Sequence, residues 1–337
     1  MERYRRSLPV AAVLAVAVLA TGCSQRTAAD TAGSQPPATA APSVLPTSRA
    51  TNSSPPVAIG AASASTGRTS SGPAAATNAS PRIAVVEAAG VRQWIDCSGS
   101  GPLTVVVIPG LAASAAAWQR VLPAFRQVTR TCIYDRPGLG DSPSRTDSHQ
   151  VLDAGLLARE LQALLDAAGE RGPYVLIGHS FGGLIARAFV AQFRSRVRGL
   201  LLAESVTPDD PSNGPFWSEA GHRIDMARSS AATDDGPKLG SMPLLVLSAS
   251  DPQGDHLGGP TYGQPAWMIA LWRREQAQDT ALSTDSIQVI AHSGHVLQQD
   301  NPAAMIAAVD ELVYSVRTGH ALVCTRSLVA DRSICTR

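Results

Sequence analysis

The sequence predicts an α/β fold in which a mostly parallel sheet of eight strands is flanked by helices. Short apolar runs alternate with helical patterns over residues 81–317, and this alternation is typical of βαβ units. The run 103–108 is apolar almost throughout, as expected of a parallel strand buried on both faces. A glycine-flanked serine, Ser180, stands between an apolar run and a helical pattern. Residues 81–317 are therefore expected to form the folded domain.

The individual elements follow from their periodicity. Residues 83–87 and 91–96 flank an Ala-Gly pair and predict a hairpin. Leucines recur on one side of the segment 152–168, which predicts an amphipathic helix. The other predicted strands are 103–108, 131–134, 174–177, 199–203, 244–247 and 287–291, and the other predicted helices are 184–193, 265–281 and 302–317. Residues 205–242, rich in Pro, Gly, Ser and Asp, are expected to form a short cap over an open cleft.

The first eighty residues are not expected to contribute to the core. Residues 1–23 combine a basic start with an apolar run too short to cross a bilayer, which is typical of an export signal. The run ends in Leu-Ala-Thr-Gly-Cys, which resembles a bacterial lipoprotein box and predicts lipidation of Cys23. Residues 24–80 are mainly Ala, Ser, Thr and Pro and predict a disordered tether. We therefore expect an extracytoplasmic protein anchored to the cell membrane by lipid alone, with simple secretion as the alternative.

Charge and cysteine content narrow the choice of partners. The net charge is +1 and no basic block occurs, so nucleic acid is not an expected partner. Four cysteines remain besides Cys23, and an even number in an exported chain suggests disulfides, with three pairings open. Cys324 and Cys335 lie close together in the tail 318–337 and would close a short local loop. Cys97 ends one predicted strand and Cys132 begins another.

The segment Gly178-His179-Ser180-Phe181-Gly182-Gly183 predicts a nucleophile elbow. An apolar strand precedes it and a helical pattern follows it, which is the context that the motif needs. Glycine is expected two residues before and two after the serine, because a Cβ there would collide with the neighbouring strand or helix. The Ser180 hydroxyl would then lie at a helix N-terminus, where the dipole favours developing negative charge.

Four segments together resemble a known family. They are Tyr134-Asp135-Arg136-Pro137-Gly138-Leu139-Gly140, Leu164-Leu165-Asp166-Ala167-Ala168-Gly169, Gly172-Pro173-Tyr174-Val175-Leu176-Ile177-Gly178-His179-Ser180 and Ser293-Gly294-His295. Over nearly all of residues 82–317 the chain resembles the α/β-hydrolases, most of all an esterase- and lipase-like branch of secreted bacterial serine hydrolases. In that fold the second strand is antiparallel and neighbours the fourth. The resemblance therefore implies a stabilising Cys97–Cys132 disulfide, and Cys324–Cys335 remains as the second pair.

The resemblance also implies a catalytic triad in the chain order serine, acid, histidine. Ser180 is the expected nucleophile and His295 the expected base, with His292 as a less favoured rival because it lies almost on its strand. Asp251 follows the seventh strand, where the family usually keeps its acid, and is the favoured carboxylate. Asp255 on the same loop and Glu204 after the sixth strand remain alternatives.

Main-chain donors are expected to bind the oxyanion. In this family they are the amide after the nucleophile, here Phe181, and an amide of the loop after the third strand, here Leu111. Many relatives have histidine where Pro109 stands, although the donor itself is a backbone group. The segment Asp135-Arg136-Pro137-Gly138 is interpreted as structural turn chemistry. No metal or cofactor motif occurs in the sequence, and none is expected.

These observations predict a serine hydrolase that cleaves small-molecule carboxylic esters through an acyl-enzyme. Three alternatives stay open: a cofactor-free haloperoxidase or perhydrolase with the same triad, a peptidase or amidase, and a non-catalytic envelope protein that uses the fold as a binding scaffold. The sequence does not indicate the oligomeric state.

Overall fold

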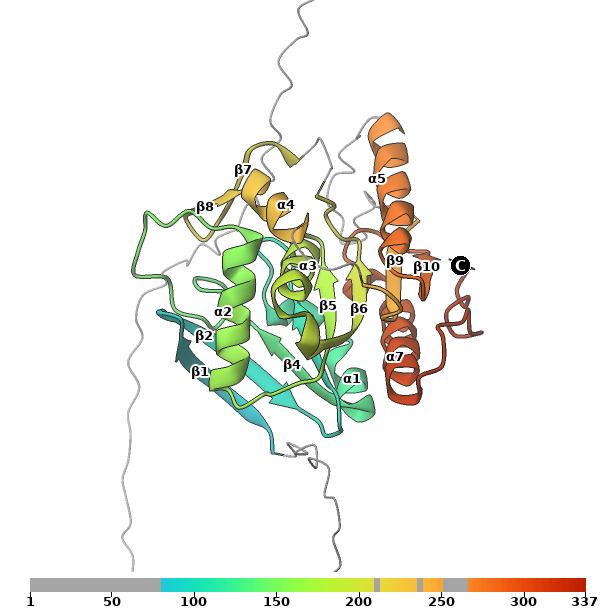
Figure 1. The fold of residues 1–337 in the computed structure, drawn as a ribbon, viewed down its shortest axis with the longest axis horizontal. Helices are drawn as coiled ribbons and strands as arrows, with labels where there is room; N and C mark the ends of the chain where they lie inside the picture. Colours follow the sequence, from blue (N-terminus) through green and yellow to red (C-terminus); the bar gives the residue numbers. More distant parts are fainter. Residues whose placement is uncertain (1–79, 209–212, 235–238, 251–265) are drawn as a thin grey trace, which may run out of the picture. The chain divides into compact units, whose positions relative to one another are not determined.

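A nine-stranded sheet runs through the part of the chain that this computed structural model describes, residues 80–208, 213–234, 239–250 and 266–337 (Figure 1). Its strand order is β1-β2-β4-β3-β5-β6-β9-β10-β11. Strands β3, β4, β5, β6, β9 and β10 are mutually parallel, whereas β1, β2 and β11 are antiparallel to their neighbours. The strands are β1 (Arg82–Ala88), β2 (Val91–Ser98), β3 (Thr104–Ile108), β4 (Arg130–Tyr134), β5 (Tyr174–His179), β6 (Val197–Ala203), β9 (Leu244–Ala249), β10 (Ser286–Ala291) and β11 (Ile334–Thr336).

The sequence predicted eight of these strands, and β11 is an addition from the C-terminal tail. It pairs with the outer edge of β10, where Cys335 lies opposite Val289. The Cys324–Cys335 disulfide closes the loop that leads into β11. Leu322 and Leu328 of the same tail are fully buried, so the tail packs on the domain. Three residues of mixed character are too short for a periodic signal, which explains why β11 is not evident from the sequence.

Helices cover both faces of the sheet because its central strands are apolar on both sides (Figure 1). Alternate residues of β3 enter opposite clusters: Val106 packs on the side of α2 and α3, and Val105 on the side of α1 and α7. The helices are α1 (Leu122–Val128), α2 (Ala154–Ala167), α3 (Phe181–Phe193), α4 (Met226–Asp234), α5 (Ala266–Asp279), α6 (Leu297–Asp300) and α7 (Pro302–Thr318). None of the helices in the described residues is both long and apolar enough to cross a bilayer.

Side-chain caps fix the start of two helices that flank the sheet, α2 and α7. The Asp153 side chain accepts a hydrogen bond from the Leu156 amide at 2.8 Å and begins α2. Asn301 does the same for the Ala304 amide at 3.0 Å, with Pro302 in the first turn of α7. Each cap is worth about 1 kcal/mol. Both helix starts lie within two residues of the predicted boundaries.

The order of the parallel strands brings distant loops together. Strands β5, β6, β9 and β10 are consecutive neighbours in the sheet. Since they run in the same direction, the residues after their carboxyl ends gather at one edge. Ser180 follows β5, Glu204 follows β6, Ser250 follows β9 and His292 follows β10. The topology therefore assembles the candidate site from four separate parts of the chain.

The segment between β6 and β9 forms a small cap. A two-stranded hairpin, β7 (Phe216–Glu219) and β8 (His222–Asp225), is followed directly by helix α4. Figure 1 shows this hairpin and α4 next to each other, with α2 and α3 nearby. The backbone of Leu152, just before α2, exchanges hydrogen bonds with Arg223 and Asp225 of β8 at 2.8 Å each. Besides its covalent connections to β6 and β9, the cap is therefore held to the domain by hydrogen bonds to Leu152.

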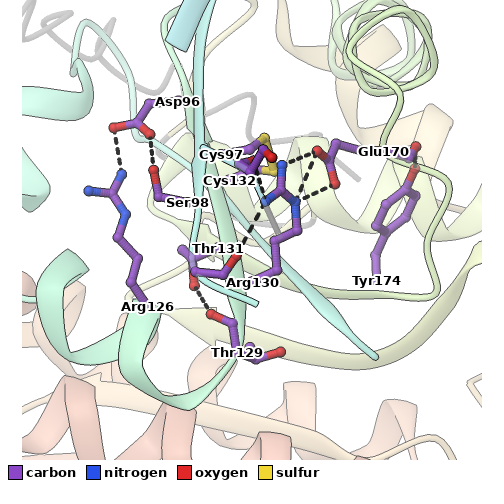
Figure 2. The surroundings of a disulfide bond; sticks show 12 residues. Asp96, Cys97, Ser98, Arg126, Thr129, Arg130, Thr131, Cys132, Glu170 and Tyr174 are labelled. Atoms are coloured by element: carbon purple, nitrogen blue, oxygen red, sulfur yellow. Dashed lines mark hydrogen bonds and ion pairs between the residues drawn. A yellow bond between two sulfur atoms is a disulfide. The ribbon is translucent and has the colours of Figure 1, made fainter. Parts of the chain in front are cut away.

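The Cys97–Cys132 disulfide is present between β2 and β4, as predicted (Figure 2). The two residues are directly opposite in the antiparallel register, and both side chains are buried. Their sequence separation is 35 residues, for which loop-closure entropy gives a stabilisation of about 4 kcal/mol. Arg130 and Glu170 form a buried ion pair of 2.7 Å beside the bridge. Because the sulfur atoms are bonded to each other, they are not thiolate ligands, and a structural role follows.

Candidate active site

Ser180 occupies a strained turn between β5 and α3. Its φ of +54° and ψ of −126° lie outside the regions that residues with a Cβ normally adopt. Such a conformation costs about 1–3 kcal/mol, which the surrounding structure must offset. The Ser180 amide donates to the Ala203 carbonyl at 3.1 Å, and the Ser180 carbonyl accepts from Val206 at 3.1 Å. These bonds hold the elbow against the end of β6.

Two glycines allow the turn to close, as the sequence predicted. A Cβ on Gly178 would lie 2.6 Å from the Gly182 carbonyl oxygen, well inside van der Waals contact. A Cβ on Gly182 would overlap the carbonyl oxygen of Ile108 at the end of β3. The strand, the elbow and the helix therefore approach each other closely only because both positions lack a side chain.

His295 lies beside the elbow and faces a buried carboxylate. Its Nδ1 is 3.4 Å from Oε2 of Glu204, at the long end of hydrogen-bond distances. The Glu204 side chain is fully buried, whereas the His295 side chain is 37% exposed. Glu204 immediately follows Ala203, whose carbonyl binds the Ser180 amide. The structure thus places the predicted base against the Glu204 alternative for the acid, and it places Glu204 next to the residue that binds the Ser180 amide.

The Glu204 carboxylate is held by two further donors. Its Oε1 accepts the Ala249 amide at 2.6 Å, and its Oε2 accepts the Trp272 indole N–H at 2.9 Å. The Trp272 ring lies edge-on to the His295 ring with 6.2 Å between centroids. Glu204 itself has φ +45°, another left-handed non-glycine residue. These contacts fix the oxygen that faces His295 and shield it from water.

The other predicted acid and base candidates fall elsewhere. Asp251 and Asp255 lie outside the described residues, so their expected roles remain predictions. His292 is exposed, and its Nδ1 is 3.5 Å from the Ser250 hydroxyl. His292 therefore has no carboxylate among the contacts of the described residues, in contrast to His295.

The two predicted oxyanion donors belong to segments that adjoin Ser180. Phe181 is the first residue of α3, so its amide has no acceptor within that helix. Leu111 lies in the loop after β3, and a Cβ on the neighbouring Gly110 would be 3.1 Å from the Ser180 Cβ. On either side of Leu111, the Ala112 amide donates to Glu219 at 2.8 Å and Arg136 donates to the Gly110 carbonyl. The loop that carries Leu111 therefore lies against the elbow.

The alpha/beta hydrolase fold model matches residues 104–300 of this chain, more than half of its length. This chain belongs to the α/β-hydrolase family. A structure of a thermophilic esterase from Thermogutta terrifontis superposes with a TM-score of 0.52 at 20% identity and covers 71% of this chain and all of the other. At that identity the likeness concerns the fold, and it agrees with the parallel sheet and flanking helices described above.

Among curated relatives, Lipase LipV of Mycobacterium tuberculosis is 34% identical over 176 residues, which are 51% of this chain and 64% of that protein. The uncharacterized protein YqjL of Bacillus subtilis is 28% identical over 170 residues, which are 45% of this chain and 64% of that protein. The chain thus spans less than two thirds of the length of either relative.

His179 is a functional neighbour that motif reasoning missed in this α/β-hydrolase. It precedes the serine, is buried, and its Nε2 lies 2.8 Å from the His295 carbonyl oxygen. A carbonyl accepts only, so the proton of the neutral ring is on Nε2 and is donated to the loop that carries His295. Burial, followed by the charge of nearby His295, lowers the pKa of His179 to about 3. His179 is therefore neutral, and its hydrogen bond holds the backbone of His295 in place.

This lowered pKa of the α/β-hydrolase's His179 predicts a loss of stability in mild acid. Below the ordinary pKa of 6.5 the unfolded state binds a proton that the folded state does not bind until about pH 3, so stability falls as pH drops through that window. At pH 5 the His179 titration should lower the free energy of unfolding by about 2 kcal/mol relative to pH 7.5. Urea unfolding at pH 7.5 and pH 5 should show a smaller pH effect for His179→Gln than for the wild type. The exposed His149→Gln is the control, and equal pH effects in all three proteins would contradict the assignment.

Three further residues of the site were not assigned from sequence: Trp272, Arg136 and Glu219. Trp272 belongs to no motif, and Arg136 is interpreted from sequence only as part of a turn. Glu219 carries no motif at all, since it acts through contacts with residues 83 and 107 positions away. Its burial, which only the structure reveals, distinguishes it from the other charged residues that the structure describes in the cap.

Proposed function

We propose that this α/β-hydrolase is a serine hydrolase that cleaves carboxylic esters of small molecules through an acyl-enzyme. The observation that carries the proposal is the His295–Glu204 contact beside the strained Ser180 elbow. A serine hydroxyl needs a base to remove its proton, and the base needs a carboxylate to fix its tautomer and stabilise its cation. All three groups are supplied at one edge of the sheet. The names of the lipase and esterase that resemble this chain agree with ester chemistry.

In the first half-reaction the Ser180 hydroxyl oxygen attacks the ester carbonyl carbon, and its proton passes to Nε2 of His295. The charge on the carbonyl oxygen is stabilised by the amides of Leu111 and Phe181. Collapse of the tetrahedral intermediate breaks the bond to the alcohol oxygen, which takes the proton from His295. Glu204 accepts the Nδ1 proton in a hydrogen bond and stabilises the imidazolium without taking up that proton itself.

In the second half-reaction water attacks the acyl-serine while His295 removes its proton. The carboxylic acid leaves, and His295 returns the proton to Ser180. Each step is an acyl or proton transfer among the ester, water and side chains of the protein, so the proposed reaction requires no cofactor.

Covalent labelling tests the reaction class. A fluorophosphonate probe should label the intact protein once per molecule, and mass spectrometry should locate the adduct on the peptide that contains Ser180. The labelled protein should lose turnover of a p-nitrophenyl ester series, whose acyl chain length then reports the substrate class. No labelling would support the binding-scaffold alternative. Faster cleavage of matched anilides, or peracid formation from acetate and peroxide that exceeds ester hydrolysis, would support the amidase or perhydrolase alternative.

We also propose that the hydrolase is exported and anchored to the cell membrane through lipid on Cys23. The basic start, the short apolar run and the Leu-Ala-Thr-Gly-Cys sequence support this proposal. In a bacterial host fed an alkyne fatty acid, the wild-type chain should incorporate the label and Cys23→Ala should not. An unlabelled wild-type chain recovered from the medium with its N-terminus near residue 23 would instead indicate simple secretion.

A further inference from the structure

The cap contributes a buried carboxylate that lies against the loop after β3, which carries Leu111 and is called the oxyanion loop below. Glu219, the last residue of β7, pairs with Arg136, which lies just after β4. The two hydrogen bonds of the pair, from Nε and Nη2 of Arg136, measure 2.7 and 2.6 Å. Each side chain is only 2% exposed. Such a pair is weak evidence for added stability, because desolvation of both charges offsets much of their attraction.

Both partners of the pair also bind the backbone around Leu111. Arg136 donates to the carbonyls of Pro109 at 2.7 Å and Gly110 at 2.5 Å. Glu219 Oε2 accepts the Ala112 amide at 2.8 Å. The Gly110 carbonyl and the Leu111 amide belong to one planar trans peptide group, so holding the carbonyl points the amide in the opposite direction. The ion pair therefore fixes both peptide planes that adjoin Leu111.

The peptide plane between Leu111 and Ala112 leads into a strained backbone conformation. Ala112 has φ +53°, which costs about 1–3 kcal/mol for a residue with a Cβ. Burial alone would raise the pKa of Glu219, but the charge and hydrogen bonds of Arg136, together with the Ala112 amide, lower it below its usual value. Glu219 is therefore ionised near neutral pH and holds Ala112 in place.

The same face of β7 also contacts the other oxyanion donor. Trp217 lies two residues before Glu219, so both side chains project to the same side of the strand. Its ring is 5.9 Å from the ring of Phe181, centroid to centroid. By contrast, Phe216 and Ser218 on the opposite side are exposed. One side of one cap strand thus contacts the residues on both sides of the oxyanion position.

We propose that Glu219, Arg136 and Trp217 are positioning residues. Through them the cap orients the Leu111 and Phe181 amides toward the oxyanion of the transition state. This role rests on the proposed ester hydrolysis. The cap hairpin would then help to stabilise the transition state as well as cover the substrate. Its signature is a loss of oxyanion stabilisation with little change in substrate binding.

The decisive variant is Glu219→Gln, measured with p-nitrophenyl acetate because its small acyl group makes few cap contacts. We expect kcat to fall about 10- to 100-fold with KM within about 2-fold, somewhat less than the loss from deleting a donor outright. A short trifluoromethyl ketone, whose adduct places an oxyanion in the hole, should bind weaker by the same factor as kcat falls. Trp217→Leu, which leaves the ion pair intact, should shift both quantities in the same direction and serves if Glu219→Gln does not fold.

Glu170→Gln is the matched control, because Glu170 forms another buried arginine pair, which lies beside the Cys97–Cys132 bridge and away from Leu111 (Figure 2). It should lower the melting temperature to a similar extent while leaving kcat within about 2-fold, since it lies at the amino end of the strands. Equal kcat for Glu219→Gln and Glu170→Gln well below both melting temperatures would overturn the inference. A wild-type protein without ester turnover or fluorophosphonate labelling would refute the proposed function itself, and this role with it.

Discussion

Ser180→Ala should abolish fluorophosphonate labelling and lower kcat for p-nitrophenyl esters by at least about 10⁴-fold. The reason is chemical: without the hydroxyl no acyl-enzyme forms, and only the oxyanion donors and the binding site remain to assist direct attack by water. KM should change little, because the alanine removes a few atoms and no binding group. The fold should be retained or stabilised, since the methyl group fits where the serine Cβ already lies.

Ser250→Ala is the matched control for this prediction. Ser250 also follows a parallel strand of the same sheet, and its hydroxyl is 3.5 Å from Nδ1 of His292. It thus tests whether any serine near a histidine at this edge supports turnover. We expect full activity and full labelling of Ser250→Ala. Retained labelling of Ser180→Ala with loss in Ser250→Ala would place the nucleophile after β9 instead of β5 and refute the proposed mechanism.

Glu204→Gln should lower kcat by about 10³- to 10⁴-fold. The amide keeps the shape of the side chain and can still accept a hydrogen bond from Ala249 or Trp272. It carries no charge, however, and so does not stabilise the imidazolium of His295 during the reaction. Initial rates and stopped-flow acylation with p-nitrophenyl acetate measure the effect, and fluorophosphonate labelling should slow in parallel because it requires the same activated serine.

Asp251→Asn is the comparison that decides the identity of the acid. The sequence favours Asp251 because the family usually places its acid after this strand, whereas the observed contact of His295 is with Glu204. If Glu204 is the acid, Asp251→Asn should keep kcat within a few-fold of the wild type. A large loss in Asp251→Asn together with near-normal activity in Glu204→Gln would reverse the assignment.

Much of the fold follows from local patterns because the strands are buried on both faces. Runs such as 103–108 and 174–177 are apolar enough to be recognised without knowledge of their neighbours, and they are strands β3 and β5. The disulfide between Cys97 and Cys132 also agrees with the prediction, because it required only the strand order that the family resemblance implied. The cap hairpin and β11 were not predicted, since their short strands have mixed polarity and depend on tertiary contacts.

The site divides in the same way. The elbow around Ser180 is a local motif in which two glycines, a strand and a helix are contiguous in the chain. His295 is recognisable from its place after the last parallel strand. Glu204 is recognisable only as one of three candidate acids. Trp272, Arg136 and Glu219 carry no such signal, because they reach the site from three separate segments.

The sequence by itself determined the family, the glycine-flanked elbow at the predicted nucleophile Ser180 and the general order of strands and helices, because each depends on residues that are close together in the chain. Only the tertiary structure decided which carboxylate faces His295 and what holds the oxyanion loop. Those choices depend on where buried charges find partners once the sheet has formed. A charge removed from water takes whichever donor the fold brings within hydrogen-bond distance, and sequence spacing does not encode that distance.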